Sequence, residues 1–497
     1  MNSAAATAAA RGLDAADFRL TCTNGFGDGW NHYAHSMAWF EGRIFVGTTR
    51  GTMAMNKWNV PRPEMRPWPV DSPEYIYDVP RQAEIWCYTP DRDRWHRAYQ
   101  APLVTGRNKQ LVPRYIGFRG MTVFQGASDH KPCLYVSTWA PALAEPPEIL
   151  RSEDGVHFEP VPRPPFPPTV RSFRTLQVFG GRVHTTPTSS TAGARRASDS
   201  IGSEATIYAT DDLQSANWRP VCDEGFGQAD NVTVFEMHVF DGHLYAATVN
   251  RNGLELWKTP GGEVPYRWTR VLQRGAWRGA FDEVGVALCD FNGALYIGTG
   301  VLNGGYHRAF QIGPAAAEIL RVWPDDSWDL LVGDPRVTPD GLRYPLSGYS
   351  SGFDNMFAGY VWRMAVHDDY LYAGTFSWAS ALPFLPMHVW PEDVVALVHR
   401  WGVANLVRHH GGCELWRSRD GAYWEPVTRN GFGNPYNWGI RNIVSTPGGL
   451  YVATANPYGP TIAQQQENGD WAYGPNPRGG CEVWRSRPPT PAGAPEP

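Results

Sequence analysis

The sequence predicts an all-β protein, specifically a seven-bladed β-propeller, and three observations carry this prediction. A hairpin pattern recurs along the chain, and a second strand signature follows each hairpin. Glycine, proline and tryptophan are also abundant, with 52, 43 and 22 residues among 497. Frequent turn residues and aromatic side chains favour many short strands over long helices. Self-similarity along a chain is typical of repeat architectures, in which neighbouring units bury a shared core.

Each repeat begins with two strands joined by a tight turn. The first strand is apolar, the turn contains glycine or aspartate, and the second strand ends in a small residue and threonine. Alternating apolar residues around such a turn are typical of an antiparallel hairpin. The seven copies lie at 39–48, 123–138, 178–186, 239–248, 290–299, 366–375 and 446–454.

A third and a fourth strand complete each predicted unit. The third has the pattern of CELWRS (413–418), and in six units a strand built on an aromatic residue follows it. The last unit lacks this fourth strand. The N-terminal segment 18–27 resembles the fourth strands at 219–227 and 425–433. We therefore expect the N-terminal strand to complete the last blade and close the ring, which removes exposed sheet edges.

The domain prediction is one propeller over residues 17–487, with a disordered lead-in at 1–16 and a proline-rich tail at 488–497. The lead-in lacks the basic start and the leucine-rich core of a secretory signal. Seven scattered cysteines without a C-x-x-C pair are typical of reduced thiols, so the sequence predicts a cytoplasmic protein.

Composition also restricts the partners. With 44 Lys and Arg against 49 Asp and Glu, the net charge is −5, which argues against nucleic acid and anionic membranes. No apolar run reaches the roughly 18 residues of a membrane span. A small molecule is the expected partner, and the sequence does not indicate an oligomeric state.

Long connections are predicted to gather on one face of the disc. They occupy 50–82, 187–204, 300–316, 333–357, 376–411 and 456–479, whereas the turns of the other face are short. The segment 391–410 has the apolar spacing of an amphipathic helix that would cap this face. Loops longer than the fold requires usually carry function, so we expect the site at this mouth of the central channel.

Residues that recur in most units are predicted to serve the fold. A glutamate occupies one position in six units, namely Glu84, Glu148, Glu255, Glu318, Glu414 and Glu482. A single active site cannot contain all of them, so we expect ion pairs or hydrogen bonds. Asn31, Asn231 and Asn437 end three G-F-G loops and are expected to bond to backbone there.

Residues that break the symmetry are the functional candidates. Counting back from each hairpin turn to the start of the first strand selects a ring of positions. This ring contains His35, Arg119, Arg174 and Arg441, with Glu236 and Arg363 one residue beyond it. Arginine suits a carboxylate, sulfate or phosphate, so we predict an anion-binding pocket. The alternative is a structural ion network around water in the channel.

Aromatic side chains and histidines complete the candidate site. Trp30, Trp139, Trp378 and Trp438 are predicted to bind substrate from the loops of the mouth, although some can merely pin those loops. Tyr473 is a candidate catalytic residue, with Glu236 and His35. His32 and His35 form an H-x-x-H pair, but they would point apart on a strand. No metal and no cofactor are predicted.

The repeat as a whole, G-x-E-[LVI]-W-R-S-x-D-G-x-x-W, resembles that of bacterial propellers with BNR/Asp-box-like (sialidase/kelch-like) repeats. This resemblance implies an architecture and no single reaction. Sialidases bind a substrate carboxylate with three arginines, but they have six blades and an early R-I-P motif that is absent here. A second resemblance, to a propeller enzyme that alkylates phenols, implies secondary-metabolite tailoring such as alkylation or cyclisation.

The predicted function is that of an enzyme acting on a small, anionic or aromatic organic substrate at the channel mouth. Glu236, His35 or Tyr473 would move a proton while the arginines stabilise negative charge. A transferase, a lyase or cyclase, and a hydrolase all fit this chemistry. The alternatives are a non-catalytic protein- or glycan-binding propeller and a sialidase-like glycoside hydrolase.

Overall fold

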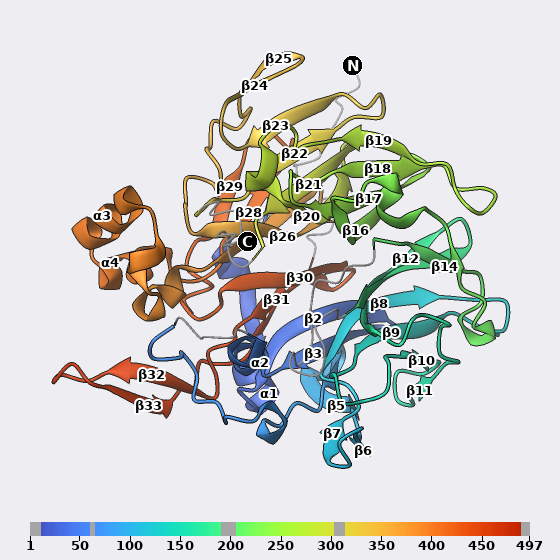
Figure 1. The fold of residues 1–497 in the computed structure, drawn as a ribbon, viewed down its shortest axis with the longest axis horizontal. Coiled ribbons are helices and arrows are strands. Elements are labelled where there is room, and N and C mark those ends of the chain that lie inside the picture. Colours follow the sequence, from blue (N-terminus) through green and yellow to red (C-terminus); the bar gives the residue numbers. More distant parts are fainter. Residues whose placement is uncertain (1–10, 60–64, 190–204, 303–313, 489–497) are drawn as a thin grey trace, which may run out of the picture.

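A computed structural model describes residues 11–59, 65–189, 205–302 and 314–488 of the chain. The described part is mostly β (Figure 1). Of its strands, 28 belong to one antiparallel network, and three separate two-stranded hairpins accompany them. The sequence prediction of a β-rich repeat protein is therefore confirmed at the level of secondary structure.

The first complete unit shows how the repeat folds. Its strands β2 (Asn31–Phe40), β3 (Arg43–Arg50), β4 (Glu84–Thr89) and β5 (Arg94–Gln100) pair in chain order, each antiparallel to the one before. The β2–β3 turn places Glu41 at φ 47° and Gly42 at φ 74°. Positive φ at both central residues is the requirement of a type I′ hairpin turn, which glycine meets at least cost.

The same four-strand order recurs along the chain. The next three units contain β8 (Gly117–Phe124), β9 (Cys133–Trp139), β10 (Ile149–Ser152) and β11 (Glu159–Pro160); β12 (Val170–Phe179), β13 (Arg182–Ser189), β14 (Tyr208–Thr210) and β15 (Arg219–Pro220); and β16 (Asn231–Phe240), β17 (His243–Asn250), β18 (Leu256–Thr259) and β19 (Thr269–Leu272). Two further units contain β20 (Val284–Phe291), β21 (Ala294–Gly300), β22 (Ile319–Val322) and β23 (Trp328–Val332); and β26 (Ala358–His367), β27 (Tyr370–Ser377), β28 (Leu415–Ser418) and β29 (Glu425–Thr428).

The last unit combines the two ends of the described chain. Its strands β30 (Gly439–Thr446), β31 (Gly449–Ala455) and β34 (Val483–Ser486) pair in order, and β1 (Phe18–Cys22) pairs with β34. Phe18 lies opposite Ser486 in this ladder. This is the partner that the sequence repeat predicts for the N-terminal strand.

The predicted disordered lead-in is wrong for residues 11–16. Leu13 is buried, and its backbone N–H donates to the hydroxyl of Tyr372. Asp14 forms an ion pair with Arg417 at 2.7 Å. An apolar anchor and a charge partner order this segment, and neither is visible in its composition. Residues 1–10 of the lead-in and 489–497 of the tail lie outside the described residues.

Neighbouring units meet along their first strands. β2 contacts both β8 and β30, and the series β8, β12, β16, β20, β26 and β30 continues in the same way. Hydrogen-bonded links between units are single residue pairs, such as Thr49 with Gly117, so the described strands form no closed sheet. In Figure 1 the colours run from blue at the bottom through green on the right to yellow at the top. First strands that are distant in sequence thus lie close to one another.

Several elements lie outside the four-stranded units. The helices are α1 (Asn24–Gly27), α2 (Thr52–Asn59), α3 (Glu392–Trp401) and α4 (Val403–His410), and the hairpins are β6 (Leu103–Thr105) with β7 (Leu111–Pro113), β24 (Arg336–Thr338) with β25 (Gly341–Arg343), and β32 (Thr461–Gln465) with β33 (Trp471–Pro475). Short 3₁₀ turns lie at Ala15–Asp17, Ile76–Asp78, Pro90–Arg92, Leu213–Ser215, Glu224–Gly227, Gly279–Asp282, Ala379–Phe384 and Met387–Val389.

The single amphipathic helix expected at 391–410 is two helices. Gly402, at φ 80°, ends α3 and begins α4. Glycine adopts this left-handed backbone without the steric cost of a Cβ atom, so it separates two helices whose apolar faces continue the same pattern. No helix of the described residues is long and apolar enough to cross a membrane. All seven cysteines are buried and carry free thiols.

Candidate functional site

The repeated glutamates are structural, as the sequence predicts. The Asn31 amide donates to the Gly25 carbonyl at 2.9 Å and to Glu84 Oε2 at 2.8 Å. Trp86 Nε1 donates to the same carboxylate, and the ring of Phe26 stacks on Trp86 at 4.8 Å. One carboxylate thus ties the G-F-G loop to the third strand. Equivalent bonds join Asn231 to Glu255 and Asn437 to Glu482.

A guanidinium also faces most of these carboxylates. Arginine–glutamate ion pairs join Arg97 to Glu84, Arg114 to Glu148, Arg270 to Glu255, Arg336 to Glu318, and Arg429 to Glu414. Each pair lies within one unit or between adjacent segments, which explains why the glutamate recurs. A buried carboxylate requires such partners because its desolvation is costly.

A β-bulge recurs near the start of the first strands. In β2 the ladder pairs Ala34 with Thr48 and Ser36 with Gly47, and His35 is left between them. Five other first strands contain the same irregularity, at Arg119, Phe235, Val286, Trp362 and Arg441. In β12 the register breaks across Arg174 and Thr175. Bulges re-aim a side chain, and these are the positions that counting along the sequence selects.

The structure brings the four candidate arginines together, in what we call the arginine cluster: Arg119, Arg174, Arg363 and Arg441, with His35 and Glu236. Burial, with the charges of Arg363 and Arg174, lowers the pKa of Arg441 to about 9. Burial lowers the pKa of Arg174 to about 10. Burial and the charges of Arg174 and Arg441 hold the pKa of Arg119 well below its ordinary value. These groups act on one another across four different strands.

Aromatic rings support three of the guanidinium groups. Arg119 lies over Trp139 at 5.1 Å, Arg174 over Phe235 at 3.8 Å and Arg441 over Trp362 at 5.1 Å, measured from Cζ to the ring centroid. A cation above an aromatic face is stabilised when water is excluded. The rings fix the positions of the arginines, but they supply no negative charge.

Hydrogen bonds distinguish the arginines from one another. Arg119 Nη1 donates to Ser172 Oγ at 2.7 Å, and Arg363 Nη1 donates to Glu236 Oε2 at 3.2 Å. Arg441 is 7% exposed and has no hydrogen-bond acceptor and no ion pair in the described part of the chain, although the more distant charge of Glu236 acts to raise its pKa. The Nε atoms of Arg363 and Arg441 are buried without a hydrogen bond there.

The six named residues of the arginine cluster contain more positive than negative groups. Among the described residues it combines four guanidinium groups with the single carboxylate of Glu236, which gives 4 − 1 = +3. Arginine stays protonated at neutral pH, so this charge persists. Burying uncompensated charge costs free energy unless a ligand or partner supplies the opposite charge.

His35 lies among these arginines as a neutral imidazole. Its side chain is 5% exposed, and Nδ1 lies 2.7 Å from Thr49 Oγ1. Burial, followed by the charges of Arg441, Arg119, Arg174 and Arg363, holds the pKa of His35 well below its ordinary value. A neutral imidazole at pH 7 can accept a proton, which a charged one cannot.

The H-x-x-H pair does not form a joint site. His32 bonds to Thr52 Oγ1 and to the Gly459 carbonyl, each at 3.0 Å, and burial lowers its pKa to about 4. Both ring nitrogens are occupied, away from the arginine cluster. No group of three or more histidine, cysteine, aspartate or glutamate side chains in the described residues could hold a metal ion.

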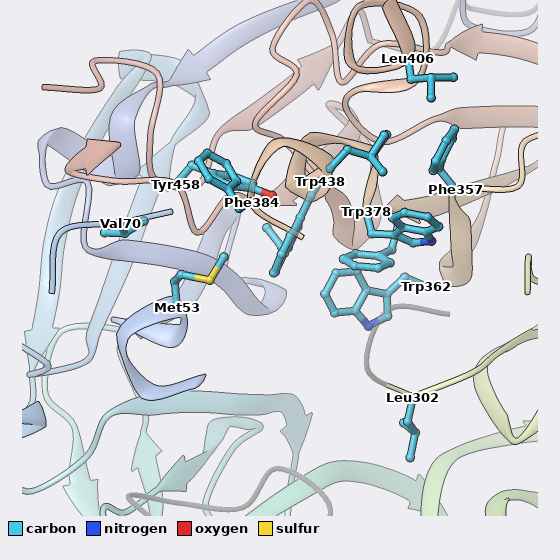
Figure 2. Close-up of a cluster of buried hydrophobic side chains, with 14 of the residues drawn as sticks. Met53, Val70, Leu302, Phe357, Trp362, Trp378, Phe384, Leu406, Trp438 and Tyr458 are labelled. Carbon is cyan, nitrogen blue, oxygen red and sulfur yellow. The ribbon is translucent and has the colours of Figure 1, made fainter. Parts of the chain in front are cut away.

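Two of the candidate tryptophans belong to a buried apolar cluster (Figure 2). Trp378 and Trp438 are buried there, and Trp30 packs against the same cluster. Trp362, which supports Arg441, joins this cluster to the arginines. Trp139 contacts both Arg119 and His35. Within the described residues, the other three predicted tryptophans do not make these two contacts.

Tyr473 lies apart from the other candidates. It belongs to the β32–β33 hairpin, which protrudes from the body (Figure 1), and its side chain is 43% exposed. Its hydroxyl donates to the Trp68 carbonyl at 2.8 Å. None of its contacts within the described residues reaches Glu236, His35 or the arginines. The long connection in which it lies forms a hairpin of its own, which sequence reasoning did not foresee.

A second buried charged group was not predicted from the sequence. Asp282 and Glu318 are both fully buried, and Arg278 lies 3.2 Å from Asp282 Oδ1 and 3.3 Å from Glu318 Oε1. Arg336 pairs with Glu318 at 2.9 Å. Burial and the neighbouring Asp282 carboxyl raise the pKa of Glu318 to about 8. We call these four residues the carboxyl cluster.

The position of Asp282 explains the carboxyl cluster. Asp282 lies four residues before the bulge at Val286, as Asn31 lies four residues before His35. An aspartate thus replaces the asparagine that faces the repeated glutamate elsewhere. The sequence signal was present, but the loop 274–282 lacks G-F-G and concealed the equivalence.

The structure also contains a hollow of about 370 Å³ at the hairpin-turn ends of β20 and β26. Its lining is Cys289, Asp290, Phe291, Asn292, Val366 and Asp369. These residues belong to the opposite ends of the strands that carry the bulges, so the hollow is separate from the arginine cluster.

Comparison with known proteins adds little to these observations. No protein-family model matches the sequence, and no curated protein matches it. Among solved structures, a GH74 xyloglucanase from Xanthomonas campestris is 13% identical, with 92% of this chain and 55% of that one covered and a TM-score of 0.41. Virginiamycin B lyase from Staphylococcus aureus is 9% identical over 78% of this chain and 98% of its own, with a TM-score of 0.37. Similarity this low carries no inference about function, which rests on the residues themselves.

Proposed function

We propose that the chain is a seven-bladed β-propeller whose ring is closed by the N-terminal strand. The four-stranded unit recurs from β2 onward, and β1 supplies the fourth strand of the last unit. The contact of β30 with β2 supports this arrangement, because it joins the last unit to the first. In a propeller the first strands surround a central channel, where the bulged residues would meet.

We further propose that this channel binds a small organic anion at the arginine cluster. One observation carries the proposal: Arg441 is almost fully buried beside other guanidinium groups and has no acceptor in the described chain. The planar guanidinium fork matches a carboxylate or a phosphate, and a bound anion would offset the repulsion within the cluster.

The chemistry proposed for this site is acid/base catalysis. His35 is neutral and lies among the arginines, so it can accept a proton from the bound substrate. The guanidinium groups would then stabilise the negative charge that develops on the substrate. Glu236, bonded to Arg363, is the second group able to move a proton. Tyr473 is not part of this proposal, because its hairpin holds it elsewhere.

A thermal-shift screen tests the proposal. Carboxylates, phosphate esters, phenols and sugars would be added to the protein and to Arg441→Gln, with Arg94→Gln, at an exposed position, as the matched control. We expect anions to raise the melting temperature of the parent and of the control but not of Arg441→Gln. Stabilisation by neutral sugars alone would contradict the anion site and favour the glycan-binding alternative.

A second measurement separates an enzyme from a binding protein. Once a ligand is known, its conversion by the parent would be compared with conversion by His35→Gln. We expect His35→Gln to bind the ligand but to lose turnover by about 100-fold or more, the usual contribution of a general base. Equal absence of turnover in both proteins would identify a non-catalytic binding propeller.

A further inference from the structure

Arg81 is a buried arginine outside the arginine cluster. It is 1% exposed, and all three nitrogens of its guanidinium group are buried without a hydrogen-bond acceptor in the described part of the chain. We propose that Arg81 and Tyr77 bind a single halide ion. This site is separate from the proposed function, because neither residue belongs to the arginine cluster.

The neighbouring Arg50 shows how this chain satisfies a buried arginine. Arg50 is 3% exposed, and its Nε donates to the Pro80 carbonyl at 2.8 Å. Its Nη1 donates to Asn31 Oδ1 at 3.0 Å, and its Nη2 donates to Asp28 Oδ2 at 2.6 Å. Pro80 directly precedes Arg81, yet no nitrogen of Arg81 has such an acceptor among the described residues. A buried charge without a partner costs free energy, so this contrast indicates a ligand at Arg81.

The position of the Arg81 side chain is fixed by its packing. Its stem lies against Gly51, where a Cβ atom would be 3.1 Å from both Cγ and Cδ of Arg81. Its guanidinium lies over the ring of Tyr77, with Cζ 5.2 Å from the ring centroid. The ring stabilises the cation, but it supplies no negative charge. The donors are therefore held in place before a ligand binds, which lowers the cost of binding.

Tyr77 supplies a hydroxyl group beside this guanidinium. Its oxygen accepts a hydrogen bond from the Leu143 backbone N–H at 3.1 Å, and its proton is donated to no acceptor among the described residues. Burial raises the pKa of Tyr77, so the hydroxyl keeps its proton at neutral pH. Burial lowers the pKa of Arg81 to about 10, and Tyr77 acts to raise it. An acceptor that reaches both groups would receive hydrogen bonds from both.

The charges around Tyr77 favour an anion as this acceptor. The guanidinium groups of Arg81 and Arg171 both act to lower the pKa of Tyr77 against the effect of burial. Arg171 donates to the carbonyls of Ala144 at 3.3 Å and Pro168 at 3.0 Å, which carry no net charge. The groups that act on the pKa of Arg81 include no carboxylate. A water molecule can accept hydrogen bonds there, but only an anion offsets the charge.

The enclosure of the site restricts the size of the anion. Tyr77 packs against a buried apolar cluster that consists of Ala54, Met55, Ile76, Val79, Ile116 and Trp139. Arg81 brings one positive charge, which a monovalent ion balances. A halide is small and spherical, so it accepts hydrogen bonds from groups that approach it from different directions. The organic anions proposed for the arginine cluster are larger than this enclosure admits.

The site lies where two units meet. Tyr77 and Arg81 belong to the connection between β3 and β4, whereas Leu143 lies between β9 and β10 of the next unit. Trp139, a member of the apolar cluster, also contacts Arg119 and His35. A bound halide would therefore stabilise the packing of two connections beside Trp139.

Melting temperatures in different salts test the inference. Sodium chloride or sodium bromide would be added to the intact chain in a halide-free buffer, and sodium acetate would be a separate arm. We expect each halide to raise the melting temperature by about 2 to 3 °C at a hundredfold excess over its dissociation constant. Acetate should not produce this rise through Arg81.

Variants locate the ion. Arg81→Met should lose the response to halide, and Tyr77→Phe should weaken it. Arg94→Met, at an exposed position, should respond as the parent does, which controls for ionic strength. Arg441→Gln should also keep the response, because Arg441 belongs to the arginine cluster.

Three results of the melting experiments would overturn the inference. A response that Arg441→Gln loses and Arg81→Met keeps would place the ion in the arginine cluster. An equal response to acetate that Arg81→Met abolishes would show that the site is not restricted to halides. A melting temperature of Arg81→Met far below that of the parent in halide-free buffer would show that Arg81 has its partner within the chain.

Crystals grown with sodium bromide provide a test that requires no variant. We expect an anomalous scattering peak within hydrogen-bond distance of the Arg81 guanidinium and the Tyr77 hydroxyl. No peak at that position would overturn the inference, and so would a peak without any rise in melting temperature, which indicates binding at crystal concentration only. These results leave the proposed function untouched, because the screen of organic anions is made at one fixed halide concentration.

Discussion

The arginine cluster and the carboxyl cluster are both buried groups of charges, but they are balanced in different ways. In the carboxyl cluster, Arg278 and Arg336 face Asp282 and Glu318, a raised pKa allows Glu318 to keep its proton, and Asp334 supplies a second carboxylate to Arg278 at 2.8 Å. In the arginine cluster, the described residues leave a charge of +3. The carboxyl cluster shows how this chain builds a structural ion network, namely with partners from within. In the arginine cluster, Arg441 has no hydrogen bond and no ion pair within the described residues, which favours a ligand over the structural alternative.

The largest effect on stability should come from removing an arginine of the carboxyl cluster. Arg278→Met would leave the buried Asp282 and Glu318 without their shared guanidinium. Removing one partner of a buried ion pair costs about 3 to 5 kcal/mol. We expect the unfolding free energy in urea to fall by that amount. A loss below about 1 kcal/mol would contradict the view that this cluster stabilises the fold.

Replacing an arginine of the arginine cluster with methionine should raise the unfolding free energy instead of lowering it. Arg441→Met removes a buried charge that repels Arg363 and Arg174. We expect the unfolding free energy without ligand to rise by about 1 kcal/mol, because an apolar side chain replaces an uncompensated ion. Stabilisation by anions should disappear in the same variant. A marked loss of stability would indicate a structural role for Arg441.

The stability that the carboxyl cluster contributes should depend on pH. The pKa of Glu318 is about 8 in the folded chain, above its ordinary value of 4.5. The stability that its proton contributes is therefore complete below pH 4.5 and is lost as the pH rises through about 8. Asp282→Asn restores the asparagine found at Asn31, and it should reduce this loss between pH 6 and 9. Melting temperatures of both proteins across this pH range measure the loss of stability. An equal decrease with pH in both proteins would contradict the raised pKa of Glu318.

The smallest effect concerns the protonation of His35. Burial and four guanidinium groups lower its pKa, whereas the Asp154 carboxylate raises the pKa of the exposed His157. NMR of the imidazole carbons at pH 5.5 should show His35 neutral and His157 charged. Because the folded pKa of His35 is depressed, its contribution to stability is present above the ordinary value and is lost as the pH falls below it. A charged His35 at pH 5.5 would remove the proposed base.

Much of the fold and part of the site could be predicted from the sequence. The repeat located the strands and the partner of β1, because hairpin turns and alternation are local signals. Counting residues also reached the bulged positions, including His35 and Arg441, since each unit spaces them alike. The repeat could not show that the loop of Tyr473 forms a separate hairpin. It also could not show that Trp378 and Trp438 would be buried, because that depends on how long loops pack.

The pairing of β1 with β34 has a consequence for how the chain is made. Thr21 donates to the Val483 carbonyl, a partner 462 residues away. A ribosome produces β1 well before β34, so β1 waits unpaired while the 462 residues up to its partner are synthesised. During that time its edge is available to other strands. The pairing of β1 with β34 then completes the last unit in one late step, and this step fixes both ends of the described chain.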